Sequence, residues 1–126
     1  MLIAMLRGKI HQATVKETNL HYPGSITIDE ALLEAADILP REKVQVVNIN
    51  NGVRFETYTI AGPRDSGIVG LNGAAARCGA PGDQLIIIAY ALVPYQEARS
   101  LRPRIVVLDG ANRVVEVKHE ETVGLS

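Results

Sequence analysis

The chain has 126 residues, of which 47% are hydrophobic and 21% are charged, so we expect one soluble globular domain, with no disordered segment. Thirteen basic and fourteen acidic residues give a net charge of -1, and the lack of any basic run argues against a nucleic-acid partner. Because Cys78 is the sole cysteine, an internal disulfide and a zinc site of several thiolates are excluded, which favours a reducing, cytoplasmic compartment.

The first third of the chain predicts a strand followed by a helix. Residues 9–15, "KIHQATV", alternate in polarity and include β-branched residues, as a half-buried strand does. Residues 29–39, "DEALLEAADIL", predict a helix with Asp29 as its N-cap and Pro40 just beyond its end. The apolar positions at helical spacing, which should face the core, are Leu32, Leu33 and Ala36.

The middle of the chain predicts a β-hairpin. "EKVQVVNI" (42–49) and "VRFETYTI" (53–60) both have strand composition, and Asn51-Gly52 lies between them. Asn-Gly is the preferred pair for a two-residue type I′ turn, so we expect that turn here. Farther on, "NGAAARC" (72–78) predicts a short helical turn.

The last third predicts more strands. "QLIIIAYALV" (84–93) is a continuous apolar run that suits a buried strand and falls well short of the roughly 20 residues of a membrane helix. "RIVVLDGANRVVEVKH" (104–119) predicts a hairpin around Asp109-Gly110. Many short strands without a repeated period favour a mainly β protein, a small closed barrel with short helices.

Motifs for metal or phosphate binding are weak. His11, His21 and His119 have no companions in an HExxH or CxxC pattern, so we expect no metal site. The glycines of "GLNGAAARCGAPGD" (70–83) match neither a P-loop nor a dinucleotide-binding fingerprint. Taken alone, Pro-Gly-Ser in "LHYPGS" (20–25) is an ordinary turn sequence.

Four of these motifs together are highly specific. The segments "MLRGKIHQATV" (5–15), "LHYPGS" (20–25), "NNGVRFETYTI" (50–60) and "NGAAARCGAPGD" (72–83) have the order and spacing found in the aspartate 1-decarboxylase family. The resemblance runs from residue 5 to about residue 103. It implies a pyruvoyl-dependent carboxy-lyase that converts L-aspartate to β-alanine and CO2 for pantothenate synthesis.

The resemblance gives the Gly24-Ser25 pair a chemical role. In the family this bond cuts itself, and the serine becomes a covalent pyruvoyl group that forms a Schiff base with the substrate amine. We therefore expect one domain, residues 1–126, that self-cleaves into residues 1–24 and 25–126 and needs no diffusible cofactor. Glycine suits the cleavage position because it has no Cβ to obstruct attack on its carbonyl group.

Other family roles carry over to matching positions. Tyr58 matches the proton donor, and the arginine and lysine at positions 54 and 9 match the cations that face substrate carboxylates. The expected substrate-binding residues are Thr57, Gly73, Ala74, Ala75, Arg54 and Lys9, and the expected supporting residues are His11, Tyr22 and Asn72. The implied fold is a six-stranded double-psi β-barrel, assembled as a homotetramer with active sites between neighbouring subunits.

Two positions depart from the family pattern. Val47 stands where a large aromatic residue is common, and Pro23 immediately precedes the pair expected to be cut. Two alternatives stay open: a non-catalytic barrel that serves as a binding or assembly module with an intact Gly-Ser turn, and a self-processing decarboxylase of another amino acid. The sequence leaves open whether maturation needs a partner.

Overall fold

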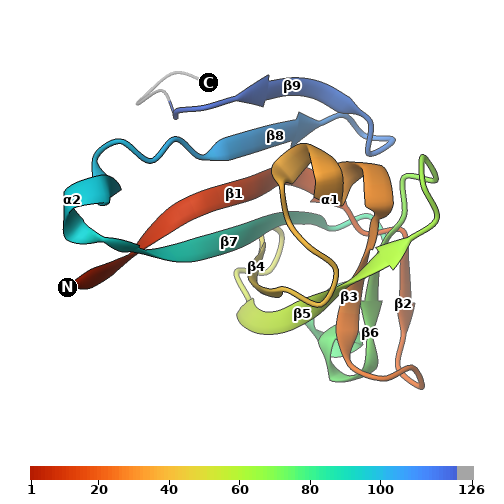
Figure 1. The fold of residues 1–126 in the computed structure, drawn as a ribbon. Coiled ribbons are helices and arrows are strands. Elements are labelled where there is room, and N and C mark those ends of the chain that lie inside the picture. Colours follow the sequence, from red (N-terminus) through yellow and green to blue (C-terminus); the bar gives the residue numbers. More distant parts are fainter. Residues whose placement is uncertain (122–126) are drawn as a thin grey trace.

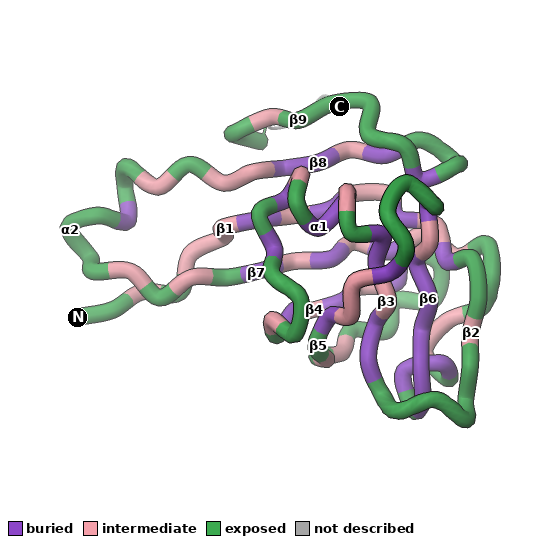
Figure 2. Tube along the Cα trace, turned by 45° about the vertical axis from the view of Figure 1, so that its right-hand side comes forward, coloured by how far each residue is buried: buried purple, intermediate pink, exposed green. Residues whose placement is uncertain are grey.

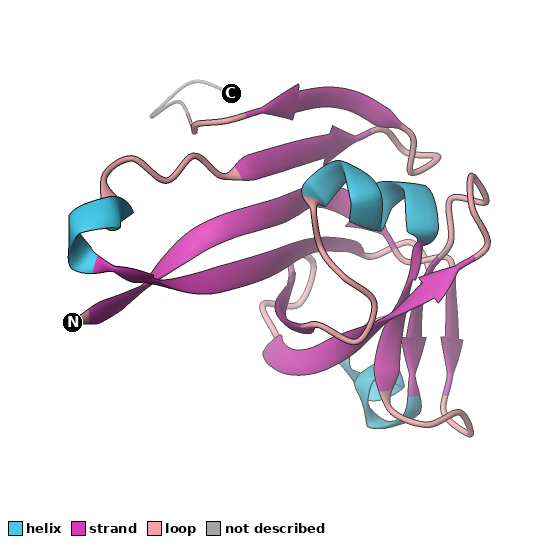
Figure 3. Cartoon of the chain, in the orientation of Figure 1, coloured by secondary structure: helices cyan, strands magenta, loops and turns pink. Residues whose placement is uncertain are grey.

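A computed structural model of the chain describes residues 1–121, and strands make up most of its regular structure (Figure 3). In chain order the elements are β1 (Leu2–Thr14), β2 (Glu17–Asn19), β3 (Ser25–Asp29), α1 (Glu30–Ala36), β4 (Lys43–Asn48), β5 (Arg54–Gly62), β6 (Val69–Asn72), the 3-10 helix η1 (Gly73–Cys78), β7 (Gln84–Pro94), α2 (Tyr95–Ala98), β8 (Arg104–Leu108) and β9 (Val114–Lys118). The predicted mainly β class with short helices is confirmed.

The strands of the described residues pair in the order β2-β6-β3-β5-β4-β7-β1-β8-β9 (Figure 1). Three neighbouring pairs, β1–β8, β2–β6 and β3–β5, run parallel, and the others run antiparallel. Within residues 1–121 no ladder joins β2 to β9, so the predicted six strands and barrel closure are not confirmed. Alternating patterns identify strands but not their partners, and the three-residue β2 is too short to leave such a pattern.

The hairpin of β4 and β5 is confirmed, but the predicted type I′ turn is wrong. That turn needs positive φ at both central residues, and of Asn51 and Gly52 only Gly52 has it, at 76°. The amide of Asn48 instead donates to the carbonyl of Val53 at 2.8 Å, and the amide of Gly52 donates to the carbonyl of Asn48 at 2.9 Å. The loop is therefore four residues long, from position 49 to position 52.

Helix α1 follows its predicted local signals. The Asp29 carboxylate accepts a hydrogen bond from the amide of Ala31 at 2.8 Å, which makes Asp29 the N-cap. The helix ends before the predicted residue 39 because Asp37 adopts the left-handed conformation, with φ of 58°. The predicted core positions Leu32, Leu33 and Ala36 are buried. No helix within residues 1–121 is long and apolar enough to span a membrane.

The core is built of aliphatic side chains from the strands and from α1. Only part of the long β1–β7 pair contributes buried residues to it (Figure 2). Leu85 and Ile87 of β7 are fully buried, whereas Tyr90 and Leu92 near its other end are 48% and 70% exposed. The prediction of a buried strand thus holds for the first half of β7 only. Its second half pairs with the start of β1 beyond the core, as Figure 1 shows.

Strand β3 brings the Pro-Gly-Ser segment against β6 and η1. It lies between β5, to which it is parallel, and β6, to which it is antiparallel. In this register Ser25 is opposite Asn72, the last residue of β6, and Ile26 is opposite Thr59 of β5. The predicted helical turn over "NGAAARC" is confirmed as η1, which starts directly after Asn72.

Candidate active site

The Gly24-Ser25 pair lies where an exposed loop enters a buried strand. Gly24 is exposed, and Ser25 is fully buried at the start of β3. The side-chain amide of Asn72 donates to the hydroxyl oxygen of Ser25 at 2.9 Å and to that of Thr27 at the same distance. The Ser25 hydroxyl makes a long contact of 3.4 Å to the carbonyl oxygen of Pro23. The serine oxygen is therefore held in place while the preceding backbone stays accessible.

Gly73 allows η1 to approach this loop closely. Its φ is 61°, and a Cβ at this position would lie 2.7 Å from both the amide nitrogen and the Cα of Gly24. The same Cβ would lie 2.8 Å from the carbonyl oxygen of Tyr22. Only glycine fits both the conformation and the space, so the backbone at position 73 packs directly on the loop before Ser25.

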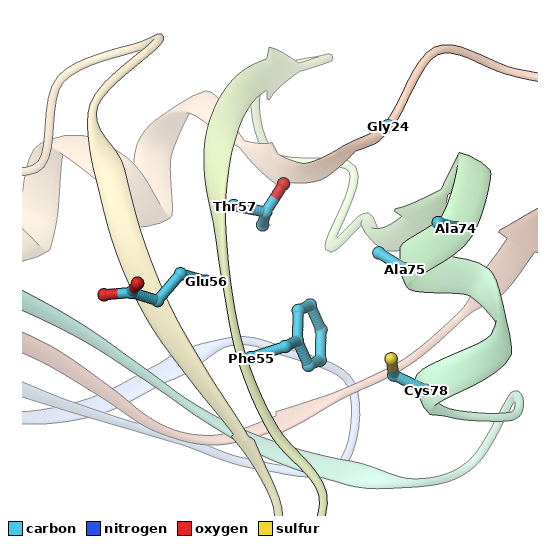
Figure 4. A pocket seen from close by; sticks show the side chains of 7 residues that line it. All are labelled: Gly24, Phe55, Glu56, Thr57, Ala74, Ala75 and Cys78. Atoms are coloured by element: carbon cyan, nitrogen blue, oxygen red, sulfur yellow. The ribbon is translucent and has the colours of Figure 1, made fainter.

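A pocket of about 260 Å³ lies between β5, the Gly24 loop and η1, and it is lined by Gly24, Phe55, Glu56, Thr57, Ala74, Ala75 and Cys78. Phe55 and Thr57 point toward η1, whereas Glu56 between them points to the other side of β5 (Figure 4). This alternation is what strand geometry requires. The pocket therefore collects Gly24, Thr57, Ala74 and Ala75 from the predicted site and has mostly apolar walls.

Three lining residues were not predicted, although two of them could have been found. Phe55 is two positions before Thr57 on the predicted strand, so it had to share the same face. Cys78 is three positions after Ala75, and residues at this spacing eclipse one another on a 3-10 helix. Its sulfur points from η1 toward Phe55 (Figure 4). Glu56 offered no comparable signal, because its side chain lies on the opposite face.

Lys9 and His11 line a second pocket, of about 400 Å³, built by β1, β8, β9 and the segment after β9. Its other lining residues are Gln12, Ile105, Val107, Glu116, Lys118 and Glu121. The ammonium group of Lys9 is paired with the carboxylate of Glu121 at 2.6 Å. None of the residues that line this pocket also lines the pocket beside Gly24. Within one described chain, Lys9 and His11 are therefore separate from the serine.

Arg54, Tyr58 and Tyr22 lie outside the first pocket as well. Arg54 and Tyr58 alternate with Phe55 and Thr57 along β5, so they project from its other face. The Arg54 guanidinium donates to the Gln45 side chain at 3.3 Å, and Tyr58 is 40% exposed. Tyr22 is 48% exposed in the loop before Pro23.

Val47, which stands where the family often has a large aromatic residue, is opposite Arg54 in the β4–β5 ladder. Residues directly opposite one another project from the same face of a sheet. Val47 therefore lies on the Arg54 face of the hairpin and does not line the pocket beside Gly24. Any effect of this valine on that pocket would have to be indirect.

The electrostatic environment of His11 favours its neutral form. Burial, the main cause, and the positive charges of Lys9 and Lys118 lower the pKa of His11 below its ordinary 6.5, against an opposing effect of Glu121. Within residues 1–121 no group of three or more His, Cys, Asp or Glu side chains is placed to hold a metal ion. The second pocket therefore combines two lysines and two glutamates with an imidazole whose neutral form is favoured.

Replacing Lys9 by Gln should raise the pKa of His11, because one of the two cations that oppose its protonation is removed. An NMR titration of the imidazole should give a wild-type pKa below 6.5 and a higher value in Lys9→Gln. Since the folded pKa lies below the unfolded one, the stability due to this group is present above pH 6.5 and lost as the pH falls below it. Lys43→Gln, a change at an exposed lysine on β4, is the control, and equal titrations of both variants would contradict the assignment.

Comparison with known proteins identifies the family of the chain. A family model described as aspartate decarboxylase matches residues 1–115. The aspartate 1-decarboxylase of Pelotomaculum thermopropionicum is 63% identical over 98% of this chain and 94% of its own length. That of Carboxydothermus hydrogenoformans is 60% identical over 98% of both chains. That of Lactiplantibacillus plantarum is 55% identical over 99% of this chain and 96% of its own length. Because the likeness extends nearly end to end in every pair, the chain belongs to the aspartate decarboxylase family.

Proposed function

We propose that this protein decarboxylates L-aspartate to β-alanine and CO2 and thereby supplies pantothenate synthesis. Membership of the aspartate decarboxylase family and relatives named aspartate 1-decarboxylase support the reaction. The observation that carries it onto this chain is the buried Ser25, whose hydroxyl oxygen is fixed by Asn72 next to the pocket at Gly24.

The cofactor of the proposed reaction is a pyruvoyl group made from Ser25. Such a group supplies an electron-withdrawing ketone that binds the substrate amine and accepts electrons when CO2 leaves. The residues around Ser25 fit it: Asn72 offers a hydrogen-bond donor 2.9 Å from the serine oxygen, and Gly73 leaves the neighbouring backbone unobstructed. Ala74 and Ala75 add little bulk to the adjoining pocket.

The proposed maturation divides the chain into residues 1–24 and 25–126. The Ser25 hydroxyl attacks the carbonyl carbon of Gly24, its proton passes to the leaving amide nitrogen, and the peptide bond becomes an ester. Elimination of the Ser25 α-hydrogen and the Gly24 carboxylate gives dehydroalanine, which reacts with one water and releases ammonia as it becomes the ketone. Gly24 supports the first step because it is exposed and has no Cβ.

The proposed substrate carries two carboxylates, so its site needs cations. Arg54 and Lys9 are assigned to this role, and His11 and Tyr22 support the site. Within one chain Lys9 and His11 line a pocket separate from Gly24. A homotetramer with active sites between subunits would let these residues of one chain complete the serine site of the next. Lys9 would then exchange its Glu121 partner for a substrate carboxylate.

Three further features belong to the same proposal. The double-psi β-barrel is assigned from membership of the aspartate decarboxylase family, since the ladders within residues 1–121 form an open strand order. A cytoplasmic location suits a sole cysteine and a biosynthetic reaction. Thr57, Ala74 and Ala75 are assigned to substrate contact because they line the pocket beside Gly24, and Gly73 is assigned to the same set.

Denaturing mass spectrometry tests the proposal directly. Purified wild-type protein should give two fragments that meet between Gly24 and Ser25, and it should release β-alanine from L-aspartate. A chain that stays intact after prolonged warming, without any maturation partner found to restore cutting, would favour the binding-module alternative. A panel of amino acids separates the other alternative, because a preference for a substrate other than aspartate would contradict the assigned reaction.

Replacing Arg54 by Lys should lower kcat/KM for aspartate by about tenfold, since lysine keeps the charge but loses the paired hydrogen bonds of a guanidinium to a carboxylate. Self-cleavage should stay near the wild-type rate, because Arg54 projects from the face of β5 opposite Thr57. Arg64→Lys is a matched control, since Arg64 pairs with Glu30 and Glu34 of the α1 region and not with this face. An unchanged kcat/KM in Arg54→Lys would remove Arg54 from the substrate site.

A further inference from the structure

Asn48 is a fully buried side chain that joins its own loop to two segments 30 and 35 residues later in the chain. Its amide nitrogen donates to the carbonyl oxygen of Cys78 at 3.0 Å and to the carboxylate of Asp83 at 2.9 Å. Its amide oxygen accepts from the backbone amide of Asn50 at 2.8 Å. The end of η1, the segment before β7 and the β4–β5 loop are therefore tied to a single residue at the end of β4.

Neighbouring groups reinforce this connection. The side chain of Asn51 donates to the same Cys78 carbonyl at 3.0 Å, so one asparagine at the end of β4 and one in the following loop hold the last residue of η1. The Asp83 carboxylate also accepts from the amide of Ala80 at 3.0 Å. The hydrogen bond from Asn48, followed by that from Ala80, keeps the pKa of Asp83 below its ordinary value. Asp83 is therefore a charged acceptor at neutral pH.

The structure held by Asn48 is one wall of the pocket beside Gly24. That wall is η1, which contributes Ala74, Ala75 and Cys78, and it faces Phe55 and Thr57 of β5 (Figure 4). Its first residue, Gly73, is packed on the Gly24 loop, and its first turn has no side-chain cap. The hydrogen bonds from Asn48 and Asn51 therefore hold the far end of η1 at its distance from β5.

We propose that Asn48 is a positioning residue for the decarboxylation: by holding the Cys78 carbonyl, it keeps the η1 wall at the spacing from β5 that the substrate requires. This inference rests on the proposed function, and Asn48 itself does not line the pocket. If the Asn48 side chain is removed, the Cys78 carbonyl keeps only the hydrogen bond from Asn51. The Asp83 carboxylate loses one of its donors. The end of η1 should then move away from β5 more often, and the Cys78 side chain should become more accessible to solvent.

Asn112 provides a stringent control, because its φ of 59° adds backbone strain to the cost of an alanine there. It is 1% exposed, and its amide nitrogen donates to the carbonyl oxygens of Thr14 at 2.9 Å and Gly67 at 2.8 Å. Its amide oxygen accepts from the amide of Thr14 at 2.8 Å. Asn112→Ala thus removes as many hydrogen bonds from an equally buried asparagine, and none of its partners lines the pocket beside Gly24.

The experiment compares Asn48→Ala, Asn112→Ala and wild type as full chains. Iodoacetamide labelling of the sole cysteine is followed by intact mass, and urea unfolding records the stability that both variants lose. Alkylation of Cys78 should be about tenfold faster in Asn48→Ala, the scale expected when hydrogen bonds at one site are lost, and unchanged in Asn112→Ala. In the processed protein the KM for aspartate should rise about tenfold in Asn48→Ala alone, with a smaller change in kcat.

Equal alkylation rates in the two variants would overturn the proposal, and so would faster alkylation of Asn48→Ala with an unchanged KM. If Asn48→Ala does not fold, Asn51→Ala serves instead, because Asn51 is exposed and supplies the other hydrogen bond to Cys78. It should give a smaller rise in both quantities. Alkylation needs no decarboxylation, so a wild type that forms no β-alanine would refute the proposed function by a separate measurement.

Discussion

The Ser25→Ala protein should remain one uncut chain and form no β-alanine from aspartate. The substitution deletes the oxygen that would attack Gly24 and later leave with its carboxylate, so neither the new amino terminus nor the ketone can arise. The fold should persist, because alanine is smaller than the fully buried serine and the Asn72 amide keeps its hydrogen bond to Thr27. Denaturing mass spectrometry and a β-alanine assay measure the two losses.

Ser66→Ala is the control for this prediction. The Ser66 hydroxyl donates to the backbone carbonyl of Pro63 at 2.6 Å, but Ser66 does not line the pocket beside Gly24. This variant should be cut and should turn over aspartate like the wild type. A fragment beginning at residue 25, or measurable β-alanine, from Ser25→Ala would refute the role assigned to the serine.

The Tyr58→Phe protein should be cut normally but should form β-alanine at least about 10²-fold more slowly, the scale of losing a positioned general acid. Once CO2 has left, the former α-carbon of the substrate must receive one proton, and the Tyr58 hydroxyl is assigned to supply it. Phenylalanine retains the ring and removes only the hydroxyl. Because Tyr58 is 40% exposed, its replacement should cost little stability, and a loss of activity should report on the proton.

Steady-state kinetics on fully processed protein distinguishes proton delivery by Tyr58 from packing of its ring against the substrate. Loss of proton delivery lowers kcat, whereas loss of packing against the substrate raises KM. Tyr95→Phe on α2 is the control, since Tyr95 is 52% exposed and does not line either pocket. A normal kcat in processed Tyr58→Phe would assign the proton to water or to another side chain.

Local rules predicted the elements better than the connections between them. The Asp29 cap, the buried face of α1 and the β4–β5 strands all depend on residues close in sequence, and they are confirmed. The type I′ turn failed because its residues have partners far away. The side chain of Asn50 accepts from the amide of Gln84 at 2.8 Å, and that of Asn51 donates to Cys78. Such distant hydrogen bonds outweigh a two-residue preference.

The predicted site divides in the same way. Gly24, Thr57, Ala74 and Ala75 meet at one pocket, but the cations assigned to the substrate lie elsewhere in the described chain. Motif spacing relates residues to a family and says nothing about which subunit supplies each one. Lys9 illustrates the limit, because its nearest charged partner, Glu121, follows it by more than a hundred residues.

The place of β1 in the sheet bears on the molecule after scission. This strand lies between β7 and β8, and Ile10 and Ala13 from it are fully buried. The proposed cut at Gly24 would therefore turn a central strand into part of a separate peptide, held by non-covalent contacts such as its ladders, its core packing and the Lys9–Glu121 ion pair. Unfolding would then release two molecules instead of one. The melting temperature of the processed protein would consequently depend on its concentration. Loss of the amino-terminal peptide would leave the facing edges of β7 and β8 without a partner strand.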